Sequence, residues 1–370
     1  MNKVGILTFH TGFNYGASLQ AFALQRTITK MGLNCEIIHF ETERFVASRE
    51  MFSRKPRRVK EFIKIATRIP YYSALKKRQK LFEDYTAQVL KTSPLYRTEA
   101  EVIAHAGDYD CIVCGSDQIW NLDKEQDAPA ANPLFFLNFP KNQRRVSYAA
   151  SFGKWVKKAH AHEDAFMPWL KEFDAVSVRE TSGVEYLRSR GIACTLTLDP
   201  TVLLDKEDYE EICAPRQIEG KYVLMFSWSC GDEVMAAAKR AAQELQLPLY
   251  HLIPPPRAMG TGIRRKLDVG PREFLSMIKN AEFVVTDSFH GTAFSTTFEK
   301  PFVSIVTGGK ADPRMESLME QLGLSDHLTD CAGMNIPALQ ETDFISVREK
   351  KTALRRSSLE FLRNALLVEE

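Results

Sequence analysis

The sequence predicts an α/β protein with two doubly wound parallel sheets that follow one another along the chain. Short apolar runs alternate with helical patterns in two successive series, which the acidic stretch 200–220 separates. The length of 370 residues agrees, because one domain usually takes roughly 100 to 200 residues. We therefore expect one domain over 1–205, a second over 206–341, and a C-terminal helix over 342–370 that can pack back on the first domain.

The first series opens with a strand, a helix and a second strand. An apolar run at 3–9 precedes the loop 10–16, and apolar residues then recur every three or four positions over 17–31. Gly32 ends this helix, since glycine is favoured just beyond a last helical turn, and 34–40 is the next strand. After a basic insertion, we expect strands at 110–114, 144–152, 174–180 and 195–199, with helices near 160–173 and up to Arg190.

The second series starts with a strand at 221–228. We then expect strands at 247–253, 282–287 and 301–306, and helices at 232–246, 272–281, from about Gly291, at 314–322 and at 342–367. A loop rich in proline, glycine and arginine occupies 254–272. Ligands of doubly wound sheets bind beyond the carboxyl ends of the strands, so those loops are where we expect the chemistry.

Composition and charge exclude several classes of protein. The chain has 49 Lys+Arg and 47 Asp+Glu, and this net charge of +2 argues against a nucleic-acid binder. It has no run of about 18 apolar residues and does not begin with an apolar leader. Its seven scattered cysteines suit a reducing compartment, so we expect a cytoplasmic protein.

Cys111 and Cys114 form a CxxC motif with two interpretations. Such a pair can bind a metal or exchange disulfides, but a second pair of ligands is missing here. The apolar neighbours favour a buried strand, in which cysteine acts as a small hydrophobic residue. We expect no metal and no cofactor.

The small net charge conceals one strongly basic segment. Residues 44–80 hold 13 basic and two acidic residues, a net charge of +11, so the rest of the chain carries −9. Apolar residues alternate with these cations, as on a surface that meets anionic lipid or a lipid-linked diphosphate. A solvated helix face is the favoured alternative, because charged faces are common, and peripheral membrane contact stays an open expectation.

Residues 286–292, with the sequence TDSFHGT, contain the clearest candidate for catalysis. They lie where an apolar strand ends and a helix begins, and the N–H groups and dipole of a helix N-terminus favour an anion. His290 can exchange a proton near neutral pH, with Asp287 and Ser288 as polar neighbours. A histidine that only orients the turn is the alternative.

Asn14 and Tyr15 lie in a glycine-containing loop between a strand and a helix, but G-x-G-x-x-G is missing, so no dinucleotide site is expected. The loop is either a place where backbone approaches a ligand or a tight turn. Arg179, at the end of another apolar strand, can clamp a carboxylate or phosphate or pair with Glu180.

A further strand end, the loop 115–121, carries side chains suited to a sugar. Ser116, Asp117 and Gln118 can hydrogen-bond hydroxyls, and the Trp120 indole can face a sugar ring. A capped turn with a core tryptophan is the alternative.

Several short motifs occur in order along most of the chain. They are NYGASLQAFAL (14–24), GSDQIWN (115–121), SYAAS (147–151), SVRE (177–180), LDPT (198–201), DSFHG (287–291) and RMESL (314–318). With these motifs the chain resembles the polysaccharide pyruvyl transferase family. The resemblance implies a fold similar to that of GT-B glycosyltransferases, with two Rossmann-like domains facing across a cleft. It implies a transferase that moves the pyruvyl unit of phosphoenolpyruvate, as a cyclic ketal, onto two hydroxyls of a sugar in cell-surface polysaccharide biosynthesis.

The resemblance also implies roles for individual residues. His290 matches the family's histidine and is the expected general acid, with Asp287 to orient it. Arg179 matches the arginine that the family uses on the donor. The second domain is the expected donor side, and the first domain is the expected acceptor side, with Asn14, Tyr15, Ser116, Asp117 and Gln118 as acceptor-binding residues.

One departure from the family concerns the donor's second cation. Family members often have an arginine two residues before this histidine, where the present chain has Ser288. We expect Ser288 to contact the donor and the missing cation to come from elsewhere. The available cations are Arg264, Arg265, Lys266, Lys310 and Arg314.

Two alternative functions stay open. One is a glycosyltransferase of the same architecture that uses a nucleotide sugar, which would require a pocket for a base and ribose. The other is a non-catalytic member that binds glycan, favoured if nothing replaces the missing arginine. The expected partners are phosphoenolpyruvate and a sugar acceptor, either free or lipid-linked.

Overall fold

A computed structural model describes residues 3–43, 46, 59–121, 132–140, 143–153, 163–254, 256–257 and 259–367. The chain divides into two compact units. Unit 1 comprises Met1–Ser48, Thr86–Leu204 and Lys350–Glu370, and unit 2 comprises Arg49–Tyr85 and Asp205–Glu349. Much of the basic segment 44–80 is thus part of the second unit.

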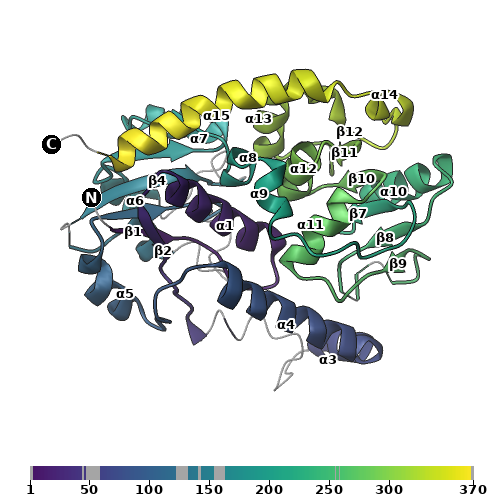
Figure 1. Cartoon of the computed structure of the whole chain (residues 1–370), viewed down its shortest axis with the longest axis horizontal. Helices are drawn as coiled ribbons and strands as arrows, with labels where there is room; N and C mark the ends of the chain where they lie inside the picture. The colour runs from purple at the N-terminus through teal and green to yellow at the C-terminus, as the bar shows by residue number, and fades with distance from the viewer. Residues whose placement is uncertain are drawn as a thin grey trace. The chain divides into compact units, whose positions relative to one another are not determined.

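Unit 1 contains a parallel sheet of six strands in the order β2-β1-β3-β4-β5-β6. Figure 1 labels β1, β2 and β4 of this sheet. The strands are β1 (Lys3–Leu7), β2 (Asn34–Ile37), β3 (Cys111–Cys114), β4 (Arg144–Ala150), β5 (Ala175–Val178) and β6 (Thr195–Leu196). The helices are α1 (Tyr15–Lys30), α5 (Glu99–His105), α6 (Glu163–Leu170), α7 (Thr181–Ser189), α8 (Pro200–Leu203) and, from Lys350 onward, α15 (Phe344–Leu366). The central strands are almost wholly buried, as the uninterrupted apolar runs predict for a parallel sheet.

Helix α1 begins at a side-chain cap and ends at a glycine. The Asn14 side chain accepts hydrogen bonds from the N–H groups of Gly16 and Ala17, at 3.0 and 3.3 Å, which satisfies two of the free donors of the first turn. Gly32 follows the last turn with φ +84°, a left-handed conformation that glycine adopts without strain.

The C-terminal helix α15 contacts the sheet of unit 1. The Leu198 N–H donates to Ser358 Oγ at 3.0 Å, and Arg144 Nε donates to the Ala365 carbonyl at 2.6 Å. Leu362 and Leu366 are fully buried. The last part of the chain is therefore an integral part of this unit.

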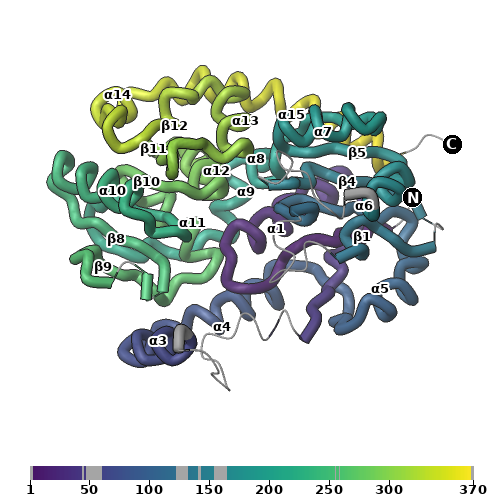
Figure 2. The backbone as a smooth tube through the Cα atoms, turned by 180° about the vertical axis from the view of Figure 1, so that it is seen from behind, coloured from purple at the N-terminus to yellow at the C-terminus, as the bar shows by residue number. Residues whose placement is uncertain are grey.

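Unit 2 contains a second parallel sheet, in the order β12-β11-β10-β7-β8-β9, which Figure 2 shows from behind. The strands are β7 (Val223–Phe226), β8 (Leu249–His251), β9 (Arg264–Arg265), β10 (Phe283–Thr286), β11 (Phe302–Ile305) and β12 (Leu328–Thr329). The helices are α3 (Val59–Arg68), α4 (Tyr72–Val89) up to Tyr85, α9 (Lys206–Glu210), α10 (Asp232–Glu244), α11 (Pro271–Lys279), α12 (Phe289–Thr297), α13 (Pro313–Leu322), α14 (Ile336–Gln340) and the start of α15 up to Glu349.

Two local details of unit 2 differ from the sequence prediction. The loop expected over 254–272 contains the short strand β9, in which Arg264 and Arg265 pair with Tyr250 and His251 of β8. Helix α12 begins at Phe289 instead of Gly291, so His290 lies inside its first turn.

Helix α4, which begins in the basic segment, packs closely against α11 within unit 2. A Cβ atom at Gly270, the residue before α11, would lie 2.6 Å from the Cβ of Leu81, so only glycine permits this approach.

No helix in the described ranges is long and apolar enough to cross a membrane.

Candidate functional site

Each sheet has a switch point, where the strand order reverses and the loops at the carboxyl ends diverge. In unit 1 it lies between β1 and β3, and in unit 2 between β7 and β10. Ligands of doubly wound sheets bind outside the strands at such points. Most of the residues that the sequence singles out follow one of these strands or begin the next helix.

Helix α1 ties together the two loops at the first switch point. Gln20 Nε2 donates to Thr8 Oγ1 at 2.9 Å and to the Phe9 carbonyl at 2.8 Å. The Gln20 side-chain oxygen accepts from the Ser116 N–H at 3.1 Å. Gly115 fits here because its φ is +127° and a Cβ would lie 2.2 Å from the Tyr148 carbonyl oxygen. Local sequence does not single out Gln20 for this role, because the residue lies in the middle of a helical pattern.

Arg179 is surrounded by carboxylates of its own unit. Its guanidinium contacts Asp199 at 2.5 Å, Asp117 at 3.5 Å and Glu180 at 4.0 Å, and its side chain is 0% exposed. Ser116 Oγ also donates to Asp199, at 2.9 Å. A donor anion at Arg179 would have to compete with these buried carboxylates. The structure thus brings Arg179, Ser116 and Asp117 into one network.

The remaining candidates of unit 1 differ in how accessible they are. Tyr15 is fully buried, and the Asn14 amide oxygen caps α1. Gln118 is half-buried and accepts a hydrogen bond from Asn121 at 2.6 Å. The Trp120 indole is 0% exposed, donates to the Phe135 carbonyl at 3.0 Å and stacks on Phe136. The interpretation of Trp120 as a sugar platform is therefore wrong, since this ring belongs to the core.

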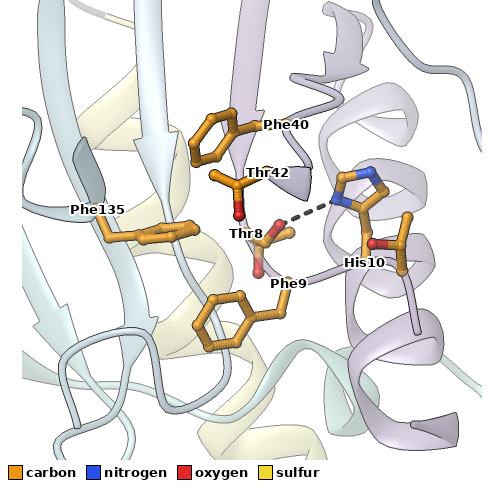
Figure 3. A pocket seen from close by; sticks show the side chains of 7 residues that line it. Thr8, Phe9, His10, Phe40, Thr42 and Phe135 are labelled. Carbon is orange, nitrogen blue, oxygen red and sulfur yellow. Dashed lines mark hydrogen bonds between the residues drawn. The ribbon is translucent and has the colours of Figure 1, made fainter. Parts of the chain in front are cut away.

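A small hollow, which no local sequence pattern predicts, lies at the carboxyl ends of β1 and β2. Figure 3 shows aromatic rings and hydroxyl groups around it. The rings of Phe9 and Phe135 meet edge to face, with centroids 5.0 Å apart. His10 Nδ1 hydrogen-bonds the Thr8 carbonyl at 3.0 Å, which fixes the plane of the imidazole. The lining residues are Thr8, Phe9, His10, Thr11, Phe40, Thr42 and Phe135.

At the second switch point, two serines from the β7 loop hold Asp287. Its Oδ2 accepts from Ser227 Oγ at 2.9 Å and from Ser229 Oγ at 2.5 Å. These serines follow a different strand from Asp287, and no local sequence pattern connects them with it. Ser288 is the N-cap residue of α12, but its side chain makes no capping hydrogen bond to the helix. Its backbone N–H donates to Thr286 Oγ1 at 3.0 Å.

His290 is the second residue of α12 and is 7% exposed. Its ring meets Phe289 edge to face, with centroids 5.2 Å apart. A Cβ at Gly291 would lie 2.3 Å from Thr286 Oγ1, so α12 starts directly against the end of β10. Among the residues that the structure describes, Asp287 bonds to Ser227 and Ser229 and not to His290.

The cations proposed to replace the missing arginine lie in different surroundings. The Arg314 side chain donates two hydrogen bonds to Asp312, at 2.8 and 2.6 Å. Lys310 is exposed in the turn after β11, and Arg264 is exposed beside Tyr250. Arg265 is half-buried and donates to the Arg257 carbonyl at 3.3 Å.

Cys111 and Cys114 are both buried in β3. Burial raises the pKa of the Cys111 thiol to about 12 and that of Cys114 well above its usual range, which disfavours the thiolate that would bind a metal. In the part of the chain that the structure describes, no three His, Cys, Asp or Glu side chains are grouped as metal ligands.

The comparisons with known proteins agree with this architecture. The family model for polysaccharide pyruvyl transferase matches residues 14–309, and no curated protein matches the chain in sequence. The UDP-GlcNAc 2-epimerase from Methanocaldococcus jannaschii is 11% identical, with a TM-score of 0.50 over 92% of each chain. The same enzyme from Neisseria meningitidis, solved with UDP-GlcNAc, is 10% identical, with a TM-score of 0.50 over 100% of this chain and 95% of its own. At these identities the likeness concerns the fold alone, the GT-B fold of two Rossmann-like domains.

Proposed function

The chain belongs to the polysaccharide pyruvyl transferase family, a family of transferases, and on this premise we propose that it moves the pyruvyl unit of phosphoenolpyruvate onto two hydroxyls of a sugar. The observation that carries the proposal is the place of His290. This histidine lies in the first turn of α12, at the carboxyl end of β10 and beside the switch point of the second sheet. Histidine is the side chain that exchanges protons most readily near neutral pH, and the first step needs a general acid.

In the proposed reaction, His290 donates a proton to C3 of phosphoenolpyruvate, and C2 becomes electrophilic. One sugar hydroxyl adds to C2 and loses its proton, and the C2–O bond to phosphate then breaks with its electron pair on the phosphate. The second hydroxyl adds to C2, loses its proton and closes the ketal. The products are the ketal and one inorganic phosphate, and no cofactor is required. A positioned general acid typically contributes ~10²- to 10⁴-fold to the rate.

Asp287 supports this chemistry in the proposal. Ser227 and Ser229 hold its carboxylate at the same strand end that leads into His290. A carboxylate close to an imidazole favours the protonated form of the ring, which is the form that donates. We assign Asp287 this electrostatic role and not a direct hydrogen bond.

The acceptor is proposed to bind at the carboxyl edge of the first sheet. The hollow of Figure 3 has a volume of about 10 Å³, which is room for a water molecule and not for a sugar ring, so we place the acceptor outside it. Asp117 and Gln118 follow the adjacent strand β3 and can accept from or donate to hydroxyls.

We also propose that α3 and the start of α4 contact an anionic membrane surface. Four large apolar side chains in this short stretch are more than half exposed, namely Phe62 (56%), Ile63 (51%), Ile69 (62%) and Tyr72 (53%). They lie within the basic segment 44–80, and a cationic apolar surface is what anionic lipid attracts.

The test of the reaction is phosphate release from phosphoenolpyruvate in the presence of candidate sugars. His290→Gln is expected to lower acceptor-dependent turnover by about 10²-fold or more, because the proton donor is lost. His105→Gln changes an exposed histidine and serves as the matched control. Circular dichroism checks that both variants fold. Full activity of His290→Gln refutes the role of this residue, and no acceptor-dependent release by the unaltered enzyme refutes the function.

A further inference from the structure

Unit 2 gathers arginines from distant parts of the chain at the carboxyl ends of β7 and β8. One lies at the end of α3, one within α4, one in the loop after β8 and one in β9. These four, which we call the arginine cluster, are Arg68, Arg78, Arg257 and Arg265.

Hydrogen bonds to backbone carbonyls position three members of the cluster. Arg78 is 1% exposed and donates to the Leu252 carbonyl at 2.8 Å. Arg257 donates to the Trp228 carbonyl in the loop after β7. Arg265 donates to the Arg257 carbonyl at 3.3 Å, and its guanidinium lies 5.8 Å from the centre of the Tyr71 ring.

The cluster brings like charges close enough to affect one another. Burial and the positive charges of Arg78 and Arg257 lower the pKa of Arg68 to about 10. Burial lowers the pKa of Lys64 as well, with Arg68 as the next cause, and Arg257 acts in the same direction. Like charges at this spacing repel one another, and an anion among the guanidinium groups would lessen that repulsion.

His251 provides a second, independent observation. It ends β8, in register with Arg265 of β9, and is 0% exposed. Neither of its ring nitrogens has a hydrogen-bond partner among the described residues. A buried imidazole without partners is costly, and such groups commonly mark a place where a ligand or water completes the bonding.

The cluster lies near the residues proposed to bind the donor. Burial raises the pKa of the Cys230 thiol. The charges of Arg257, Asp287 and Arg265 also act on this pKa, so all three side chains lie near Cys230. Cys230 follows Ser227 and Ser229 in the β7 loop, and these serines hold Asp287. Guanidinium groups are therefore present on the same edge of the sheet as Asp287 and His290.

We propose that the arginine cluster binds a phosphate group. The ligand meets Arg68, Arg257 and Arg265, which are half-buried or exposed, while the buried Arg78 supports them. In this proposal a phosphate oxygen, or a water bound beside it, completes the hydrogen bonding of His251. Guanidinium groups suit this role because they bind phosphate oxygens through paired, charge-assisted hydrogen bonds. The phosphate can belong to phosphoenolpyruvate or to the diphosphate of a nucleotide- or lipid-linked sugar. Only the first of these rests on the proposed function.

Isothermal titration calorimetry on the full chain, without acceptor, tests the site. The ligands are phosphoenolpyruvate, inorganic phosphate and UDP-N-acetylglucosamine, with pyruvate as the analogue that has no phosphate. The variants are Arg257→Gln and Arg265→Gln, which alter the more accessible members. Lys221→Gln is the matched control, because it removes one positive charge beside Glu282 at the amino end of β7. We expect at least one phosphate-bearing ligand to bind, each cluster variant to weaken it about tenfold or more, and the control to stay within about twofold.

The outcomes separate the site from the reaction. Weaker phosphoenolpyruvate binding in the variants identifies the donor as the ligand, and an effect on UDP-N-acetylglucosamine alone identifies a diphosphate. Phosphoenolpyruvate binding that is the same in the variants and the unaltered chain, with no effect on UDP-N-acetylglucosamine either, overturns the site and leaves the proposed function standing. Binding of only the diphosphate ligand to the unaltered chain, lost in the variants, supports the site and contradicts the proposed donor. Binding of none of the three overturns both.

Discussion

Acidification is expected to destabilise unit 2 through His251. Burial and the positive charge of Arg265 lower the pKa of this histidine from 6.5 to about 4. The strands on either side place Met225 of β7 and Arg265 of β9 beside it, so Arg265 is its charged neighbour in the sheet. Below pH 6.5 the unfolded chain binds a proton at this residue, whereas the folded chain does not until the pH approaches 4. The free energy of unfolding therefore falls as the pH is lowered through this interval.

The size of the effect follows from the two pKa values. A difference of 2.5 pH units corresponds to about 3.4 kcal/mol at 1.36 kcal/mol per unit, which is the upper limit reached well below pH 4. Of this, about 2 kcal/mol is expected to be lost between pH 7 and pH 5, since the unfolded histidine is almost fully protonated at pH 5 and the folded one is not.

Urea unfolding at pH 7 and pH 5, followed by circular dichroism, measures this loss. His251→Leu removes the titrating group, so the unaltered chain should lose about 2 kcal/mol more than the variant over this interval. His327, whose pKa is also lowered by burial, contributes in the same direction in both proteins and cancels in the comparison. His105→Gln, at an exposed site, should behave like the unaltered chain. An equal loss in His251→Leu and the unaltered chain would show that His251 is protonated in the folded state at pH 5, and would refute the reasoning.

Two further predictions concern stability and membrane contact. Arg179→Gln leaves the buried carboxylate of Asp199 without its cation. We expect this change to lower the free energy of unfolding at pH 7, measured by urea titration, by about 3 to 5 kcal/mol. A loss below about 1 kcal/mol would contradict a structural role for the ion pair. Replacing Phe62 and Ile63 by serine should weaken cosedimentation with phosphatidylglycerol vesicles about tenfold or more, because two exposed apolar side chains are lost. As the control, Ile345→Ser removes an apolar side chain that is 67% exposed on α15 and should change cosedimentation little. No sedimentation of the unaltered chain would leave the α3 surface as a solvated face.

The fold could be predicted because buried parallel strands have a strong local signature. The runs at 111–114 and 283–286 are continuous stretches of residues that fit a sheet buried on both faces, and helical patterns follow them. Strand β9 could not be predicted in this way, because it consists of two charged residues, Arg264 and Arg265, and a strand prediction needs a longer run of apolar residues. They form a strand only because β8 offers a free edge in register with them.

The candidate site could be predicted in part. Asp287 and His290 stand out locally, since they follow an apolar strand. Ser227 and Ser229, which hold Asp287, lie 60 and 58 residues away in the chain, and only the pairing of β7 with β10 brings them together. The surroundings of Arg179 were equally out of reach, because Asp199 and Asp117 come from other strand ends. Local sequence thus indicates which residues end a strand but not what they contact.

The structure changes the interpretation of the basic segment most. An ordinary solvated helix would direct its cations to water and its apolar residues inward. Helix α3 departs from this pattern. Its cations Lys64 and Arg68 are half-buried near Arg257. Its apolar residues Phe62 and Ile63 are more than half exposed. Each half of this arrangement is unfavourable in water alone, since like charges are gathered on one side and apolar surface is hydrated on the other. An anion among the arginines and a membrane surface against the exposed residues would together remove both costs. The phosphate titrations and the vesicle assay test these two halves separately, since Arg257→Gln alters the arginine cluster beside the half-buried cations of α3 and the serine variants alter its exposed apolar side chains.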